Sequence, residues 1–337
     1  MSQLSLLSIA PGATIQDRGR PGLLRYGVTQ GGALDPYGLA EGQALLQNRA
    51  EDAALELPGF GGRFRAKGVV QVATSGGAMA LSVNGQPMVW RQSIWMADGD
   101  VMEIGAAEDG VVGYLHIAGG FQTRRDLGAR STHLRAGFGH RPARGDTLGA
   151  GRGGQGTAMS LPRPAYLDQR RLRVIWGPQS HLFTEATRSA FLAARFSATG
   201  KRDRMGLVLA QEGPALRLEA GLSIASDVTL LGDIQLTGDA VPTVLLADRG
   251  SSGGYPRIAT VVAADLKVVA QLPIGAEIGV DLITPEEALD LARAEAREIG
   301  TLAAQCRPVL RDPRDIGDLL AYNLVDGVVR GDETDAD

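Results

Sequence analysis

Short apolar runs, rather than helical repeats, dominate the chain. Aliphatic and β-branched residues cluster over a few positions, and Gly, Asp or Asn closes each run. Strands at such close spacing, joined by Gly/Asp turns, favour barrels or sandwiches over an alternating strand–helix sheet. The predicted strands cover residues 69–74, 79–83, 88–90, 94–96, 101–104 and 111–117, and then 172–176, 215–219, 243–247, 258–262 and 277–283.

Three segments carry helix-start signals. Asp35 followed by Pro36 predicts a cap and a first helical residue, with a helix to about Gln47. A second helix is predicted over residues 184–195. The clearest start is at Thr284, where Pro285 takes the first helical position and Glu287 completes a capping box. We expect this last helix to pack on the outside of the second half.

A glycine-rich bridge at residues 149–156 divides the chain into two β-rich halves. The bridge fits the G-x-G-x-x-G pattern, but Pro162 and Pro164 follow it where a dinucleotide site needs a helix, so it is interpreted as a linker. The sequence thus predicts an N-terminal barrel over residues 1–150 and a linker over 151–168. A C-terminal barrel with its helix is predicted over 169–310, and an acidic tail over 311–337.

The composition of the chain argues against several classes of protein. The only Cys, Cys306, excludes an internal disulfide and a multi-Cys metal site, and the four His residues show no metal-ligand spacing. A net charge of −4 gives no reason to expect a nucleic-acid partner. Without a long apolar run or a charged leader, the sequence predicts no membrane span and a cytoplasmic protein.

Glycine makes up 46 of 337 residues, roughly twice the usual share of about 7%. Many of these glycines lie in loops beside Arg, Asp, Gln and hydroxyl residues. Arg can bind a carboxylate or phosphate through two parallel hydrogen bonds. Gln can hold a planar amide, and N–H groups of Gly loops can bind anions. These loops predict a site for a small, planar, amide-like anionic substrate. For any single residue, ordinary Arg–Asp bridging between loops remains an equal alternative. A G-x-S-x-G match at 250–254 leads into a strand, which argues against a serine hydrolase.

At these loops the sequence resembles the biotin-dependent carboxyltransferase family, which includes the C subunit of 5-oxoprolinase (KipA). The shared landmarks run in order over roughly residues 5–290. They include the QDRGRPG run at 16–22, GALD at 32–35, LGARST at 127–132, DRMG at 203–206, GDIQ at 232–235 and GGYP at 253–256.

The resemblance implies a mainly β fold of two cyclophilin-like β-barrel domains with a few peripheral helices. It implies the C subunit of a bacterial ATP-dependent 5-oxoprolinase, which would convert 5-oxoproline to glutamate with the A subunit of that complex and its KipI-like B subunit. One alternative is a carboxyltransferase half-domain that moves CO₂ from carboxybiotin to urea or a similar amide. This chain lacks an Ala-Met-Lys-Met motif, so it would not carry biotin itself. The other alternative is a non-enzymatic, KipA-like regulator that binds its sister subunit.

We expect the site residues to fall into four roles. The expected anion-binding arginines are Arg20, Arg130 and Arg204, and the glutamines that would position the amide are Gln16, Gln235 and Gln271. Oxygen atoms of the substrate would contact Ser131, Thr132, Ser251, Ser252, Gly253, Gly254 and Tyr255. The candidates for orienting the arginines or acting as general base are Asp17, Asp35 and Asp248. The chain departs from the family at Arg202, where a Ser is usual.

Overall fold

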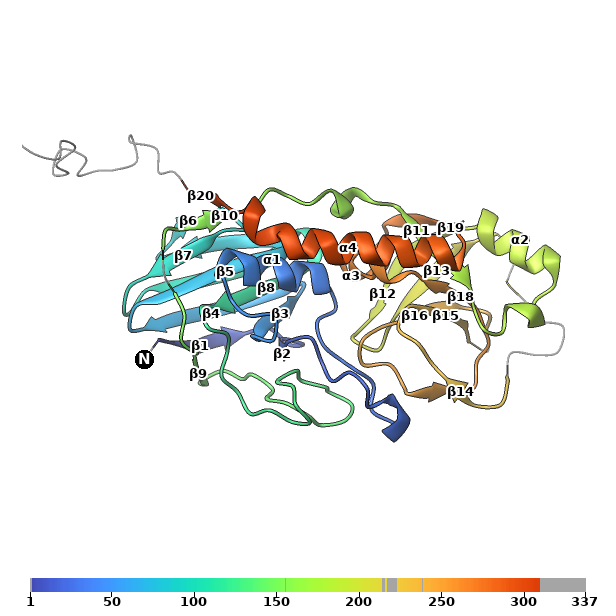
Figure 1. The fold of residues 1–337 in the computed structure, drawn as a ribbon, viewed down its shortest axis with the longest axis horizontal. Helices are drawn as coiled ribbons and strands as arrows, with labels where there is room; N and C mark the ends of the chain where they lie inside the picture. The colour runs from blue at the N-terminus through green and yellow to red at the C-terminus, as the bar shows by residue number, and fades with distance from the viewer. Residues whose placement is uncertain (1, 155, 214–215, 217–222, 238, 310–337) are drawn as a thin grey trace, which may run out of the picture.

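The computed structural model describes residues 2–309 apart from 155, 214–215, 217–222 and 238. The predicted acidic tail at 311–337 and most of the predicted strand at 215–219 lie outside the described residues. Figure 1 shows two β-rich halves side by side, with the long C-terminal helix lying across both.

The first half is a single curled antiparallel sheet. Its strands are β1 (Gln3–Ile9), β2 (Thr14–Gln16), β3 (Ala54–Pro58), β4 (Phe60–Lys67), β5 (Val70–Val83), β6 (Gln86–Pro87), β7 (Ser93–Met96), β8 (Val101–Ile117) and β9 (Thr147–Gly149). The order is β2-β3-β8-β4-β1-β9, and β5 joins β8 to β6 and β7. The short strands β2, β7 and β9 each pair on one side only, so the sheet keeps open edges.

Two long strands, β5 and β8, organise this sheet. The sequence predicts a break at Asp109-Gly110, yet β8 continues through it, and β5 merges two predicted strands into one. Register shifts between Gly76 and Leu81 absorb the irregularity and bend the pair. The predicted strand at 88–90 is wrong, because pairing in that hairpin ends at Pro87.

The second half closes into a barrel. Its strands are β11 (Arg171–Trp176), β12 (Arg195–Arg202), β13 (Gly206–Glu212), β15 (Asp233–Leu236), β16 (Pro242–Leu245), β18 (Arg257–Val261) and β19 (Glu277–Leu282). The ring runs β11-β18-β15-β16-β13-β12-β19, and the parallel pair β11–β19 closes it. Two small sheets flank the halves: β10 (Met159–Ser160) with β20 (Arg307–Pro308), and β14 (Asp227–Val228) with β17 (Ser252–Gly253).

The prediction of a mainly β protein is therefore confirmed, but only the second half is a closed ring among the described strands. Open edges make the first half a curled sheet rather than the predicted barrel. Whether either half is cyclophilin-like in detail stays a prediction, as do the domain boundaries.

The described residues form four α-helices: α1 (Pro36–Leu45), α2 (Glu185–Ala193), α3 (Leu266–Gln271) and α4 (Pro285–Gln305). The predicted starts are confirmed by their caps, because Asp35 accepts from the N–H of Gly38 and Thr284 forms the capping box with Glu287. The sequence did not predict α3. In the same part of the chain, 3₁₀ turns lie at η1 (Leu24–Tyr26), η2 (Ala165–Asp168), η3 (Ser180–Leu182) and η4 (Ala263–Asp265).

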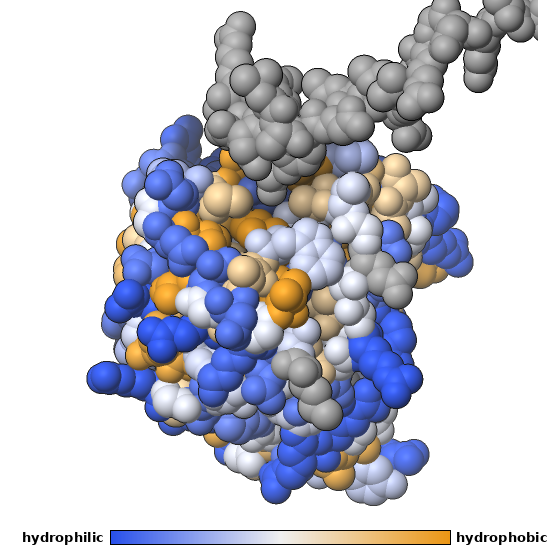
Figure 2. Space-filling model, turned by 90° about the vertical axis from the view of Figure 1, so that its left-hand side faces the viewer, coloured by the Kyte–Doolittle hydropathy of each residue, from blue (hydrophilic) through white to orange (hydrophobic). Residues whose placement is uncertain are grey.

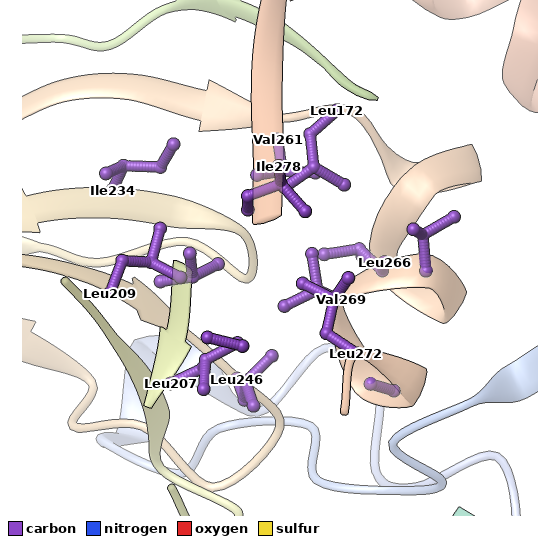
Figure 3. Close-up of a cluster of buried hydrophobic side chains, with 14 of the residues drawn as sticks. Leu172, Leu207, Leu209, Ile234, Leu246, Val261, Leu266, Val269, Leu272 and Ile278 are labelled. Carbon is purple, nitrogen blue, oxygen red and sulfur yellow. The ribbon is translucent and has the colours of Figure 1, made fainter. Parts of the chain in front are cut away.

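One hydrophobic cluster runs through the junction of the two halves. Tyr37 of α1 and Tyr114 of β8 belong to the same buried cluster as Val269 of α3 and the inner face of the barrel. Figure 3 shows barrel residues such as Leu172 and Leu209 converging with Val269 of α3 and with Leu272, which follows this helix. Because this apolar surface is shared, the halves pack as one body and can build a site from loops of both.

One face of the molecule carries both apolar and polar residues (Figure 2). Figure 2 shows the free end of the first half, where apolar residues are scattered among polar ones on the visible face. No helix among the described residues is long and apolar enough to cross a membrane. Within the same residues, no group of three or more His, Cys, Asp or Glu side chains is arranged to hold a metal ion.

Candidate functional site

Arg204 lies buried at the junction of the halves. Its guanidinium donates to Asp248 at 3.0 and 2.9 Å, to the carbonyl oxygen of Gly32 at 2.7 Å, and to Glu56 of β3. Burial lowers the pKa of Arg204, but the carboxylates of Glu56 and Asp248 outweigh burial and raise it overall. Because two carboxylates and a carbonyl already hold it, Arg204 joins the two halves rather than presenting a free anion-binding fork.

Gln271, the last residue of α3, is also fully engaged at this junction. Its Oε1 accepts from the N–H groups of Val111 and Val112 at 2.8 and 2.9 Å. Its Nε2 donates to Val112 O and to Asp35, both at 2.8 Å. These four bonds use the hydrogen-bonding capacity of the amide. Gln271 therefore bridges the halves in the same way as Arg204.

Asp35 is the partner of Gln271 and is completely buried. One carboxylate oxygen accepts from Gly38 N at 2.8 Å and caps α1, while the other accepts from the Tyr166 hydroxyl at 2.7 Å and from Gln271. Burial raises the pKa of Asp35. The structure thus places Asp35 at a helix start inside the junction.

Another set of predicted residues ties two loops of the first half together. Asp17 accepts hydrogen bonds from Gly19 N at 2.8 Å, Arg130 N at 2.7 Å and the Ser131 hydroxyl. The guanidinium of Arg130 donates to Thr123 O and Gln122. Two further predicted residues make loop contacts here: Thr132 donates to His140 O at 2.6 Å, and Gln16 donates to Thr132 O at 2.9 Å.

Arg20 is the predicted arginine with a buried nitrogen that has no partner among the described residues. Its Nε donates to Asp126 O at 2.9 Å and its Nη2 to Ser131 O at 2.5 Å, and the guanidinium stacks on Phe138. Its Nη1 is buried without a hydrogen-bond partner in the described part of the chain. Burial lowers the pKa of Arg20. Since Arg20 is only 2% exposed, it is an interior group rather than a ligand-contacting one.

Five other predicted residues of the second half behave differently, because they line a cavity. A hollow of about 530 Å³ opens on the barrel, with walls that include Gln235, Ser252, Gly253, Gly254 and Tyr255. Ser251 is next to this wall but does not line it. The side chains of Gln235, Ser252 and Tyr255 make no hydrogen bond to another described residue, so these groups are available to a ligand.

Four cations that were not among the predicted site residues line the same cavity: Arg135, Lys201, Arg249 and Arg202, the position where the sequence departs from the family. The one acidic residue in the wall is Asp203, whose carboxylate is bonded to the N–H groups of Met205 and Gly206 at 2.7 and 3.1 Å. The cavity is therefore strongly positive, as a site for an anion must be.

Two of these cations donate to backbone carbonyls. Arg202 donates to Leu272 O at 2.5 Å and Ala270 O at 2.8 Å, and Arg249 donates to Thr229 O at 3.3 Å. Burial lowers the pKa of both arginines. Both arginines belong to loops in which Arg stands near Gly, at 202–206 and 248–256, and this pattern is visible in the sequence. The sequence alone does not show that Arg204 turns inward while Arg202 faces the cavity.

The first half completes this cavity through Arg135. Arg135 lies in the loop that follows β8, and its Nη1 would be 3.2 Å from a side-chain carbon placed on Gly250. In the same loop His133 is hydrogen-bonded to the hydroxyl of Thr29 at 2.9 Å, and that hydroxyl contacts Arg249 O at 3.4 Å. The cavity thus depends on the packing of both halves.

A mainly β protein with an amide-bearing, positively charged cavity at the junction of two β-rich halves is consistent with a carboxyltransferase domain. The family described as "Carboxyltransferase domain, subdomain A and B" matches residues 26–280, and the chain belongs to this family. The resemblance seen in the sequence is confirmed.

Among individual proteins, the chain is similar to the C subunit of 5-oxoprolinase from Haemophilus influenzae, with 29% identity over 297 residues. It is 30% identical over 296 residues to the protein of the same name from Escherichia coli, and in both cases 86% of this chain matches 94% of the relative. It is also 30% identical to the urea amidolyase of Lachancea kluyveri, of which it covers only 18%.

Solved structures share the fold. The urea amidolyase of K. lactis superposes with a TM-score of 0.81, and the urea carboxylase of Kluyveromyces lactis with 0.79. Each match covers 92% of this chain at 24% identity, and the chain spans 21% and 31% of those longer proteins. At this identity the likeness concerns the fold alone.

Proposed function

We propose that this chain is the C subunit of a bacterial ATP-dependent 5-oxoprolinase, acting in the cytoplasm with the A subunit of that complex and its KipI-like B subunit. Similarity to two proteins of that name along 94% of their length supports the proposal. The observation that carries it is the cavity, because the unbonded amide of Gln235 shares one wall with four cations. A ring amide with a carboxylate matches both features.

In this proposal, the cavity residues bind and orient the substrate. The carboxylate of 5-oxoproline would be bound by the arginines, and Gln235 would hold the ring amide through one donor and one acceptor. The backbone N–H groups of Gly253 and Gly254, with the Ser252 hydroxyl, are suited to an oxygen that gains negative charge. ATP consumed by the complex would activate the amide oxygen.

The other predicted residues receive supporting roles. Asp17, Asp35 and Asp248 already accept hydrogen bonds from backbone or side-chain donors, so we assign them to positioning rather than to proton transfer. Arg204 and Gln271 would fix the two halves so that Arg135 reaches the cavity.

The family match also favours a second candidate, a carboxyltransferase acting on urea or a similar amide. Biotin carried by a separate protein would supply the carboxyl group. The cavity fits such a group, since unbonded amide and cationic side chains suit a ureido ring and a carboxylate. In that role, Gln235 and the arginines would bind and orient the two reactants.

The test is reconstitution. The chain is purified with its A and B partners, and 5-oxoproline-dependent ATP hydrolysis and glutamate formation are measured. We expect both to require all three proteins. Absence of glutamate, with carboxyl transfer from a carboxybiotin carrier instead, would replace the leading proposal by the second. A complex that forms and changes only its partner's behaviour would support the regulator.

A further inference from the structure

Arg202, the last residue of β12, has an unusual environment among the arginines of the second half. Its guanidinium contacts two carbonyl oxygens, those of Ala270 and Leu272, and no carboxylate within the described residues. Two other arginines of this half, unlike Arg202 and Arg249, form ion pairs with described residues. Arg204 pairs with Asp248, and Arg257 pairs with Asp227.

The position of Arg202 leaves donors for a ligand. A guanidinium has five N–H donors, and two of those of Arg202 are bonded, so three have no partner among the described residues. Arg249 in the same wall uses only its Nε within the described residues. Both side chains line the cavity and are held in place by the carbonyls they contact. Such fixed donors bind a planar anion with little loss of side-chain freedom.

Placing a cation away from water without an opposite charge is unfavourable, and a bound anion would offset that cost. Among the described residues Asp203 forms no ion pair with Arg202 or Arg249, and its carboxylate accepts from Met205 N and Gly206 N in its own turn. Asp233 attracts the charge of Arg249 but is not paired with it. The rim residues Arg135 and Lys201 are exposed, so solvent screens their charge. The strongest anion-binding point is therefore the wall formed by Arg202 and Arg249.

We propose that Arg202 is a specificity-determining residue that binds the carboxylate of the substrate, with Arg249 beside it. The site then accepts amides that carry a carboxylate and rejects neutral amides of the same shape. This inference rests on the proposed function, because it places the amide substrate in the same cavity.

Two probes differ only in the group that Arg202 would recognise: 5-oxoproline, and 2-pyrrolidinone, which has the same ring without the carboxylate. Binding of each to the full chain is measured by calorimetry. We expect the wild type to prefer 5-oxoproline by roughly 10- to 100-fold, the range for hydrogen bonds to charged groups. R202M should lose this preference and bind 2-pyrrolidinone as the wild type does. R202K should keep part of it.

Arg195 supplies the matched control, since it begins the strand that Arg202 ends and lies exposed outside the cavity. R195M should bind both probes like the wild type, and thermal unfolding of each variant verifies that it is folded. A folded R202M that still prefers 5-oxoproline, or a wild type with no preference, overturns the inference.

The same variants separate this inference from the proposed function. If the Arg202-dependent preference appears but the reconstituted complex makes no glutamate, the inference stands and the function fails. If glutamate is made and R202M retains the wild-type kcat/KM for 5-oxoproline, the function stands and the inference fails.

Discussion

Arg204 and Glu56 form an ion pair across the junction of the two halves, although 148 residues separate them in the chain. Both side chains are almost completely buried, and Asp248 bonds the same guanidinium. The contact couples the barrel to the curled sheet, and through them it positions the loops around the cavity.

Breaking this pair should strongly destabilise the protein. R204M leaves Glu56 and Asp248 buried without their cation, so we expect a loss of about 3–5 kcal/mol in the free energy of unfolding. Urea denaturation of the wild type and of R204M measures this difference in the free energy of unfolding. The exposed pair Arg63–Glu103 provides the control, and R63M should cost no more than about 1 kcal/mol. Equal losses in the two variants would show that Arg204 is not a buried link.

Substitution of Gln271 should lower the stability of the protein, whereas substitution of Gln235 should not. Q271M removes the acceptor of the N–H groups of Val111 and Val112 and a donor to Asp35. We therefore expect the free energy of unfolding, measured by urea denaturation, to fall by roughly 1–3 kcal/mol. Q235M removes a side chain without a hydrogen bond in the described structure and should unfold like the wild type. A stable Q271M would contradict the structural role assigned to Gln271.

Two helical glycines should respond to alanine in opposite directions. A Cβ on Gly42 of α1 would lie 2.1 Å from the ring of His116, whereas one on Gly300 of α4 meets nothing within 4 Å. G300A should therefore stabilise the protein by roughly 0.5–1 kcal/mol through helix propensity. G42A gains the same helix propensity, but it should destabilise the protein because the added Cβ would collide with the ring of His116. Thermal unfolding of the two variants checks the contrast, and a stabilised G42A would refute the packing of α1 against β8.

His116 should make the protein sensitive to acid. Burial lowers its pKa from 6.5 to about 3, so the folded state stays neutral where the unfolded state takes up a proton. Stability from this residue is complete above about pH 6.5 and falls by up to about 1.4 kcal/mol per pH unit as the pH decreases toward 3.

H116Q should remove this part of the pH dependence. The free energy of unfolding is compared at about pH 7 and about pH 5, and the loss on acidification should be smaller in H116Q than in the wild type. His181 is exposed, so H181Q is the control and should keep the wild-type loss. An unchanged loss in H116Q would mean that His116 is not a neutral interior residue.

Local signals predicted much of the fold. Caps at Asp35, Thr184 and Thr284 act within a few residues, so the starts of α1, α2 and α4 could be read directly. The closure of the barrel could not be predicted from the sequence, because it depends on pairing between strands far apart in the chain, such as β11 and β19. The continuation of β8 through Asp109-Gly110 likewise depends on its partner β5, whose bulges accommodate the turn residues.

The candidate site was only partly predictable for the same reason. Residue type indicated that Arg and Gln beside Gly belong together, but Arg202 and Arg204 differ by two positions and face different environments. Arg204 meets Glu56 from the other half, while Arg202 faces the cavity. Which arginine remains without a carboxylate partner is decided by tertiary contacts that a single sequence does not show.

Binding of the substrate amide in the cavity that contains Gln235 is central to the proposed function. The most direct test is kcat/KM for 5-oxoproline-dependent ATP hydrolysis by the reconstituted complex carrying wild-type chain, Q235M, or the exposed control Q305M. We predict a fall of roughly 10- to 1000-fold for Q235M, with unchanged stability and unchanged assembly of the complex, and no change for Q305M. An active complex in which Q235M retains the wild-type kcat/KM would contradict this role for the cavity.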